Sequence, residues 1–262
     1  MSFDLMHHLP FALSGFAVGA MVGLTGVGGG SLMTPLLVLL FGIHPATAVG
    51  TDLLYAGITK ISGSTVHSMK GSIDWKVTRR LVMGSAPASL VCLALLSHFG
   101  GGSDSANSLI STILGFALLF TSASLLFRPW FVAKAAPYFD RQPEQRIALL
   151  TVALGAALGV LVTFSSVGAG AVGVTVLLML YPRMPIVRVV GSDIAHAVPL
   201  TLIAGGGHWL MGSVDWSLLL SLLAGSIPGV AIASLFAQRA PDKLLRSLLA
   251  GVLILVGGKL AF

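Results

Sequence analysis

A glycine-rich stretch inside a long apolar run places the strongest constraint on how this chain can fold. Residues 25–31 read Thr-Gly-Val-Gly-Gly-Gly-Ser, and the apolar run extends from about Leu9 to Phe41. Glycine disfavours a helix by about 1 kcal/mol per residue relative to alanine, so this stretch predicts a break in the helix. Unpaired backbone groups are costly at membrane depth, and such a break persists only inside protein or beside a polar cavity.

The composition indicates that lipid surrounds this break. Of the 262 residues, 55% are hydrophobic and 9% are charged, whereas soluble domains carry roughly 25% charged residues. The net charge of +6 does not indicate a nucleic-acid partner, because the basic residues are scattered in short loops between apolar runs. The single cysteine, Cys92, excludes an internal disulfide framework. We predict an all-α polytopic membrane protein whose partner is the lipid bilayer.

Two of the apolar segments are too short to cross a membrane. Segments 30–42 and 169–181 each hold about 13 residues, which span roughly 20 Å at 1.5 Å per residue, against a hydrocarbon core of about 30 Å. We therefore expect broken or re-entrant helices there. A short interfacial helix is expected around residues 130–138. The ten apolar segments lie at residues 9–24, 30–42, 46–66, 76–97, 106–127, 144–163, 169–181, 185–208, 216–236 and 242–261.

The second half of the chain repeats the first. Gly15 is matched by Gly155, 140 residues later, and after one inserted residue the offset becomes 141. At that offset Gly-Thr-Asp at residues 50–52 matches Gly-Ser-Asp at 191–193. Gly-Ser-Ile-Asp-Trp at residues 71–75 likewise matches Gly-Ser-Val-Asp-Trp at 212–216. We predict an N-terminal transmembrane repeat (residues 1–127), a cytoplasmic linker (128–143) and a C-terminal transmembrane repeat (144–262).

The basic residues indicate that the two repeats are inverted. The loop near Gly71 is flanked by cations, whereas its counterpart near Gly212 is not, so the positive-inside rule places the two loops on opposite sides. Each half then needs an odd number of crossings, and both termini are expected outside. Five crossings per half, or three plus a re-entrant hairpin, satisfy this equally, giving about eight to ten membrane segments. The cations assigned to cytoplasmic loops are Lys70, Lys76, Arg79, Arg80, Arg128, Lys134, Arg141, Arg146, Arg183, Arg188, Arg239, Lys243 and Arg246.

A second glycine-containing break, near Gly168, provides a counterpart to the first. Matched breaks in two inverted repeats are typical of a transporter binding site near the membrane midplane. Backbone N–H groups at the start of a half-helix attract anions, although close helix packing through small residues is an alternative. The candidate substrate-binding residues are Thr25, Gly26, Val27, Gly28, Gly29, Gly30, Ser31, Thr51, Ser165, Ser166, Gly168, Ala169, Gly170 and Ser192.

Two carboxylates lie well inside apolar segments. A charge inside the membrane is expensive and marks a functional candidate, so Asp52 and Asp193 are interpreted as proton-coupling or site-shaping residues. The alternative is a structural helix cap, which Gly-Thr-Asp and Gly-Ser-Asp sequences also favour.

Four further polar residues rank lower as site candidates. Lys60 follows Asp52 by about two turns, and we expect it to snorkel to the inner end of its helix rather than to neutralise Asp52 or bind substrate. His67, His196 and His208 can handle protons or serve as caps. We find no metal-ligand spacing, no cofactor motif and no catalytic constellation, so an enzyme is not expected.

Several motifs together resemble the TauE/SafE family of sulfite exporters. They are Gly-x3-Gly…Gly-x-Thr-Gly-Val-Gly-Gly-Gly at residues 15–30, Pro35, Ala-Val-Gly-Thr-Asp at 48–52 and Gly-x2-Asp-Trp at 71–75. The resemblance covers residues 11 to 260, and it implies a multi-pass inner-membrane transporter for sulfite, organosulfonates or related small sulfur-containing anions. Ala169 stands where the first break has Gly29, so the two breaks are not identical.

Two other functional classes share these sequence features. A passive anion channel would show the same composition and breaks, and a non-transporting membrane assembly subunit would lack flux on its own. Among these, the sequence favours a secondary transporter that is coupled to an ion and works by alternating access. A homo-oligomer is compatible with the sequence.

Overall fold

Each predicted apolar segment contains a helix in the described part of the chain. The computed structural model describes residues 5–25, 30–98, 104–234 and 242–261. Each of the ten expected segments forms a helix, and the linker contains the expected short helix. The described residues form eleven helices, which are α1 (Leu5–Thr25), α2 (Gly30–Leu39), α3 (Pro45–Met69), α4 (Trp75–His98), α5 (Asp104–Leu126), α6 (Arg128–Phe139), α7 (Glu144–Ser165), α8 (Val172–Leu180), α9 (Ile186–Leu210), α10 (Trp216–Ser234) and α11 (Asp242–Ala261).

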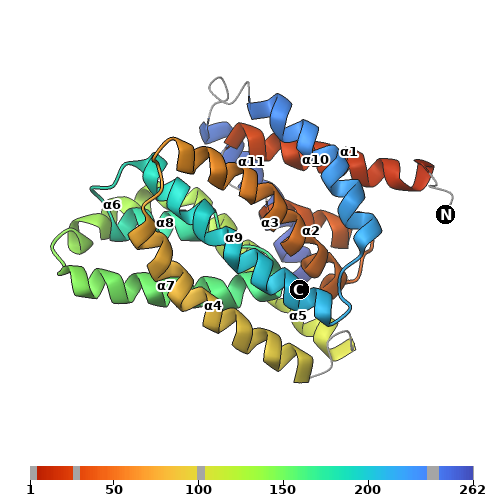
Figure 1. Cartoon of the computed structure of the whole chain (residues 1–262), viewed down its shortest axis with the longest axis horizontal. Helices are drawn as coiled ribbons and strands as arrows, with labels where there is room; N and C mark the ends of the chain where they lie inside the picture. The colour runs from red at the N-terminus through yellow and green to blue at the C-terminus, as the bar shows by residue number, and fades with distance from the viewer. Residues whose placement is uncertain (1–4, 26–29, 99–103, 235–241, 262) are drawn as a thin grey trace.

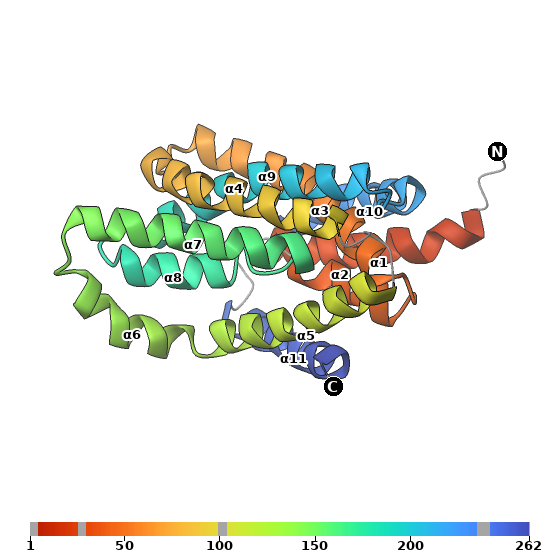
Figure 2. The ribbon, with the colours of Figure 1, turned by 90° about the horizontal axis from the view of Figure 1, so that it is seen from below.

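The helices stack in three layers that mix the two halves of the chain (Figures 1 and 2). One layer holds α3, α4, α9 and α10, the middle layer holds α1, α2, α7 and α8, and the third holds α5, α6 and α11. The largest helix–helix interfaces join α1 to α10, α4 to α7, α5 to α11 and α3 to α9. Each of these interfaces pairs a helix from before α6 with one from after it.

The glycines at these interfaces make equivalent contacts in the two halves. A Cβ atom on Gly15 of α1 would overlap the carbonyl oxygen of Leu222 in α10. A Cβ atom on Gly155 of α7 would overlap that of Leu81 in α4, and these residues are related to the first pair by offsets of 140 and 141. Small residues allow such close backbone approach between membrane helices. The repeat seen in the sequence is therefore a repeat of tertiary contacts.

Helices α3 and α9 run antiparallel through the centre of the molecule. Gly57 of α3 lies against Leu202 of α9, and Gly205 of α9 lies against Leu54 of α3. This register places Thr59 opposite Leu200, and these two residues are 141 positions apart, the offset of the repeat. An approximate two-fold axis thus passes between α3 and α9 at this point, as inverted repeats require.

The protein is a multi-pass membrane protein. Among the described residues, α4, α7, α9 and the part of α10 from Trp216 to Ala233 are each long and apolar enough to cross a bilayer. The Ile110–Leu126 part of α5 and helix α6 meet this test together but are bent by 75° at their junction. Shorter apolar stretches lie in α1, at His8–Val22, and in α11, at Ala250–Leu260.

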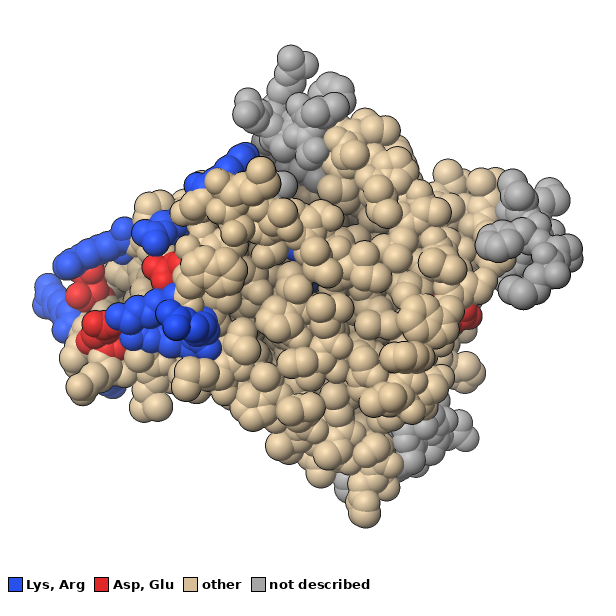
Figure 3. All heavy atoms as spheres, in the orientation of Figure 1, with Lys and Arg blue, Asp and Glu red and all other residues tan. Residues whose placement is uncertain are grey.

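Charged side chains gather at one end of the molecule, which we call the charged end (Figure 3). It comprises the start of α4, the start of α7, the α6–α7 connection and the α8–α9 connection. Ion pairs there join Lys76 and Arg80 to Glu144, Arg183 to Asp140, and Arg188 to Asp74. Helix α1 begins at the opposite end in Figure 1. Charged side chains thus gather at one end of the long axis. This agrees with the distribution of basic residues from which the orientation in the membrane is predicted.

Candidate anion site at the helix breaks

The second break, residues 166–171, is a buried stretch of non-helical backbone between α7 and α8. Ser166 adopts the left-handed conformation with φ 57°, and Gly168 and Gly170 have φ of 119° and 101°. The φ values of the two glycines are strained for residues with side chains, which explains why glycine stands there. All six residues of the break are buried. The predicted interruption of the helix by residues 166–171 is therefore confirmed.

This break presents backbone donors without acceptors. The carbonyl of Gly168 accepts hydrogen bonds from the N–H groups of Val172 and Gly173, at 3.0 and 3.2 Å. Among the described residues, no backbone carbonyl accepts a hydrogen bond from the N–H groups of residues 168–171. The N–H of Gly170 is directed at the carboxylate of Asp193. Successive free N–H groups before a helix form a concavity that suits an anion.

The first break lies between the end of α1 at Thr25 and the start of α2 at Gly30. Gly26, Val27, Gly28 and Gly29 fall outside the described residues, and so do the side chains of Thr25 and Ser31. The predicted interruption of the helix at these glycines stays a prediction. The role of these residues in binding stays a prediction.

Asp52 of α3 is fully buried beside α2 and the second break. Its Oδ2 accepts hydrogen bonds from the backbone N–H and the hydroxyl of Thr34 in α2, at 3.2 and 2.5 Å. The hydroxyl of Ser166, in the second break, lies near this carboxylate without completing a hydrogen bond. Asp52 therefore anchors α2 to α3, and this arrangement fits the site-shaping interpretation.

Asp193 of α9 is buried to the same degree but is bound differently. Neither of its carboxylate oxygens has a hydrogen-bond partner among the described residues. Its Oδ1 lies against Gly173, where a Cβ atom would overlap it, so the carboxylate packs on the first turn of α8. Asp193 thus faces the second break, as Asp52 faces the start of α2.

Lys60 does not reach the membrane interface, and the expectation that it snorkels is wrong. Its side chain is 7% exposed, in the middle of α3 and next to the approximate two-fold axis. It interacts electrostatically with Asp193 and Asp52, but no carboxylate of the described residues lies within 4.0 Å of its ammonium group. The helix continues for two and a half turns beyond Lys60, and packing against α9 keeps the side chain inside.

Arg128 does not lie in a cytoplasmic loop, and the prediction that it does is wrong. It is buried at the junction of α5 and α6, where the chain bends. Its Nε donates to the hydroxyl of Thr175 at 3.0 Å, and its Nη2 donates to the carbonyl of Ala171 at 3.4 Å. The guanidinium therefore holds α6 against the start of α8, beside the second break.

The hydroxyls of Thr51 and Ser192 both bind the start of a helix in the opposite half. Ser192 accepts the N–H of Asp74 at 2.8 Å, and Thr51 accepts the N–H of Asp215 at 3.1 Å. Asp74 and Asp215 in turn cap the helices α4 and α10. A contribution of Thr51 or Ser192 to substrate binding stays a prediction. Ser165 donates its hydroxyl to the carbonyl of Leu161 at 2.6 Å.

The three candidate histidines have separate partners. His67 Nδ1 lies 2.9 Å from the hydroxyl of Ser72, at the charged end. His196 Nε2 lies 2.9 Å from the hydroxyl of Ser85, and His208 Nε2 lies 3.0 Å from the carbonyl of Thr163. Of these, only His196 is close to Lys60 and Asp193. In the described part of the chain, no three His, Cys, Asp or Glu side chains are placed to hold a metal ion.

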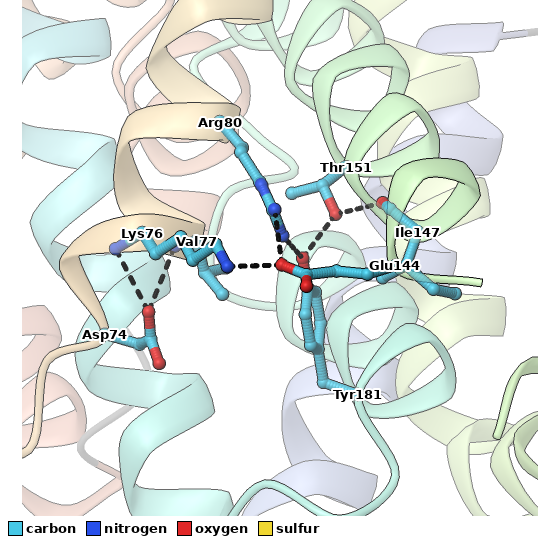
Figure 4. Close-up of polar contacts among 8 residues, drawn as sticks. All are labelled: Asp74, Lys76, Val77, Arg80, Glu144, Ile147, Thr151 and Tyr181. Carbon is cyan, nitrogen blue, oxygen red and sulfur yellow. Dashed lines mark hydrogen bonds and ion pairs between the residues drawn. The ribbon is translucent and has the colours of Figure 1, made fainter. Parts of the chain in front are cut away.

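A polar network closes the charged end between α4 and α7 (Figure 4). Glu144 pairs with Lys76, and with Arg80 at 3.0 Å, while Arg80 also donates to the hydroxyl of Tyr181 at 3.3 Å. Beside this network lies a cavity of about 380 Å³ whose lining includes Asp140, Arg183 and Arg188. The network thus joins helices from the two halves on the side predicted to be cytoplasmic.

The residues that sequence reasoning missed are Thr34 and Thr175. They are 141 positions apart, in α2 and α8, and each lies in a helix that follows a break. The repeat offset of 141 relates the two threonines to each other. However, a hydroxyl in an apolar helix commonly bonds the backbone of its own helix, so a threonine there does not by itself indicate a site residue. Their partners, Asp52 and Arg128, come from distant parts of the chain.

Comparison with known sequences agrees with these features. Residues 11–260 match the family described as Sulfite exporter TauE/SafE. The probable membrane transporter protein YjnA of Bacillus subtilis (strain 168) is 37% identical over 249 residues, covering 95% of this chain and 97% of that protein. The probable membrane transporter protein YdhB of the same organism is 31% identical over 235 residues, covering 88% and 91%.

A more distant relative is the probable membrane transporter protein of Xylella fastidiosa (strain 9a5c). It is 27% identical over 232 residues, covering 86% of this chain and 83% of that protein. No solved structure matches the chain. The family match spans both breaks, both buried carboxylates and the two copies of the Asp-Trp motif, and the chain belongs to the TauE/SafE family of membrane transporters.

Proposed function

We propose that this protein is a secondary transporter that moves sulfite, an organosulfonate or a related small sulfur-containing anion across the bacterial inner membrane. The observation that carries this proposal is the second break, where the N–H groups of residues 168–171 donate to no backbone carbonyl of the described residues. An oxyanion accepts several hydrogen bonds at once and would occupy such a concavity without a side-chain cation at each oxygen. The Ser166 hydroxyl, which has no partner among the described residues, adds a further donor.

The proposed mechanism is alternating access between the two inverted repeats. The anion would bind between the first and second breaks, and one repeat would rock against the other about the α3–α9 contact. The polar network around Glu144 would then close the cytoplasmic side. In this orientation the charged end faces the cytoplasm and both termini lie outside.

Uptake of ³⁵S-labelled sulfite into proteoliposomes that contain the purified protein tests this function. The assay compares vesicles with and without an imposed pH gradient, and adds unlabelled taurine, sulfoacetate or sulfate as competitors. We expect saturable uptake and counterflow, in which internal unlabelled sulfite accelerates entry of label. Flux that does not saturate and shows no counterflow would indicate a channel. Absence of flux for every sulfur anion would overturn the proposal.

A variant at the second break provides a specific control. Gly168→Ala forces a side chain onto a backbone with φ of 119°, so we expect it to reduce sulfite uptake at least tenfold. Ala169→Gly changes a neighbouring residue of the same break, adds no atoms and should retain uptake. Equal activity of the two variants would argue against this break as the anion site.

A further inference from the structure

The twin carboxylates Asp52 and Asp193 have different partners although they are equivalent in the repeat. Asp52 is held by the backbone N–H and the hydroxyl of Thr34. The equivalent of Thr34 is Thr175, but its hydroxyl donates to the carbonyl of Ala171 at 2.7 Å and accepts from Arg128. The second half therefore lacks the cap that the first half gives its carboxylate. Asp193 has two oxygens without a hydrogen-bond partner among the described residues.

The buried lysine near these carboxylates, Lys60, is also present in one half only. Lys60 is 93% buried, and its equivalent in α9 is Thr201, whose hydroxyl donates to the carbonyl of Ala197 in its own helix at 2.8 Å. The charges of Asp193 and Asp52 both lie within electrostatic range of Lys60. A desolvated ammonium group without an ion pair is unfavourable, and it indicates that another group completes its environment in part of the working cycle.

The ionisable groups that face Asp193 come from three helices. Lys60 reaches it from α3, Arg128 from α6, and His196 lies one turn later on α9 itself. Helix α8 contributes Gly173 and Thr175, and α4 contributes Ser85 through His196. Within the described residues of α4 and α7, the Lys, Arg and Glu side chains lie in their first two turns, at the charged end. Asp193 thus has two cations and a histidine near it, and none of them binds it directly.

From this asymmetry we propose that Asp193, and not Asp52, takes up the coupling proton, and that Lys60 is the cation whose charge is then balanced by the substrate anion instead of by Asp193. The inference rests on the proposed transport function. A proton from water adds to a carboxylate oxygen of Asp193 and leaves on the other side of the membrane together with the anion. Asp52, Asp193, Lys60 and Arg128 sum to zero charge, and one proton plus one monovalent anion preserves that sum.

The roles of the two carboxylates separate in a paired substitution experiment. In proteoliposomes with labelled sulfite, we expect an acidic exterior to accelerate uptake by the unmodified protein at least fivefold. Asp193→Asn should abolish this acceleration yet retain counterflow, because exchange needs no net proton movement. Asp52→Asn is the matched control. Its uptake should still be accelerated by an acidic exterior by the same factor as in the unmodified protein, even if the total uptake is lower.

The results that contradict the inference differ from those that contradict the function. Sulfite uptake by the unmodified protein without any response to the pH gradient would overturn the proton step and leave the transporter intact. Retained acceleration in Asp193→Asn would do the same. Absence of sulfite flux in the unmodified protein would instead overturn the proposed function.

A second pair of variants tests the role of Lys60. Lys60→Thr installs the residue of the other half, and we expect it to raise the KM for sulfite at least tenfold, whereas Lys60→Arg should restore most of the affinity. The double variant Lys60→Thr/Asp193→Asn keeps the charge balanced and should be more stable to heat than Lys60→Thr alone. An unchanged KM in Lys60→Thr would remove Lys60 from the anion site.

Chemical labelling tests the inference without any transport. Dicyclohexylcarbodiimide reacts with protonated carboxyl groups in apolar surroundings, and the adduct is located by mass spectrometry of peptides. We expect labelling of Asp193 that increases as the pH falls, with at least fivefold less at Asp52. Faster labelling of Asp52, equal labelling of both residues or labelling of neither would overturn the assignment.

Discussion

Tyr55 of α3 donates a hydrogen bond of 2.7 Å to the hydroxyl of Ser226 in α10. The residue equivalent to Tyr55 is His196, and it contacts Ser85, the equivalent of Ser226, at 2.9 Å. The same buried position thus joins α3 to α10 in one half and α9 to α4 in the other through different side chains. Both halves have a polar contact to serine at this position, but the partner is a tyrosine in one half and a histidine in the other.

Loss of this contact should be measurable as a change in stability. Tyr55→Phe removes the hydroxyl from a buried pair, and we expect the free energy of unfolding to fall by about 1 kcal/mol. Thermal unfolding in detergent, followed by tryptophan fluorescence, should show a Tm lower by a few degrees. Tyr138→Phe, at an exposed position on α6, is the control, and an equal loss in that variant would contradict the assignment.

The contact between α4 and α7 should be sensitive to a single methyl group. A Cβ atom on Gly84 would overlap the carbonyl oxygen of Val152, so Gly84→Ala should separate the helices and destabilise the protein by roughly 1–3 kcal/mol. Gly251 of α11 has nothing within 4 Å of an added Cβ atom. We expect Gly251→Ala to leave the Tm unchanged or to raise it slightly, and similar losses in both variants would exclude the packing explanation.

The bond between Thr34 and Asp52 should stabilise the short helix α2. Thr34→Val keeps the shape of the side chain but leaves Asp52 with one hydrogen bond instead of two, and we expect a loss of about 1–3 kcal/mol. Thr34→Ser keeps the hydroxyl and should retain most of the stability. The comparison of the two Tm values checks this, and equal Tm values would show that the hydroxyl is not required.

The ion pairs of Glu144 should control how readily the charged end opens. Glu144→Gln removes the partner of Lys76 and Arg80, and we expect faster hydrogen–deuterium exchange in peptides that cover the first turns of α4 and α7. High salt should have the same effect on the unmodified protein, since exposed ion pairs are screened. Asp140→Asn removes a different ion pair, to Arg183, and should change exchange near the α6–α7 and α8–α9 connections instead.

The helix positions could be predicted because they depend on local sequence. Each long apolar run became a helix, and the Ser-x-Asp-Trp motifs mark where α4 and α10 begin. The second break also follows from local chemistry, since Gly168 and Gly170 adopt backbone angles that few other residues tolerate. Burial of Asp52 and Asp193 was predicted because a charge far inside an apolar run has no route to water.

The positions of the buried cations could not be predicted in the same way. Lys60 and Arg128 both lie near the ends of apolar segments, where a long side chain ordinarily reaches the interface. Whether they do depends on which helices pack against them, and these contacts come from α9 and from α8, far along the chain. The hydroxyls of Thr51 and Ser192 likewise bind helix starts in the opposite half. These contacts depend on how the halves pack, and no local sequence pattern predicts them.

The exchange of partners between the halves has a consequence for biosynthesis. Helix α1 is made well before α10, its main neighbour, so much of the face of α1 that contacts α10 stays uncovered until α10 has been synthesised. A ribosome-bound fragment ending after α5 has no complete interface of its own. Such a fragment depends on translocon or chaperone protection, yet two separately synthesised halves could assemble in the membrane because their surfaces are complementary.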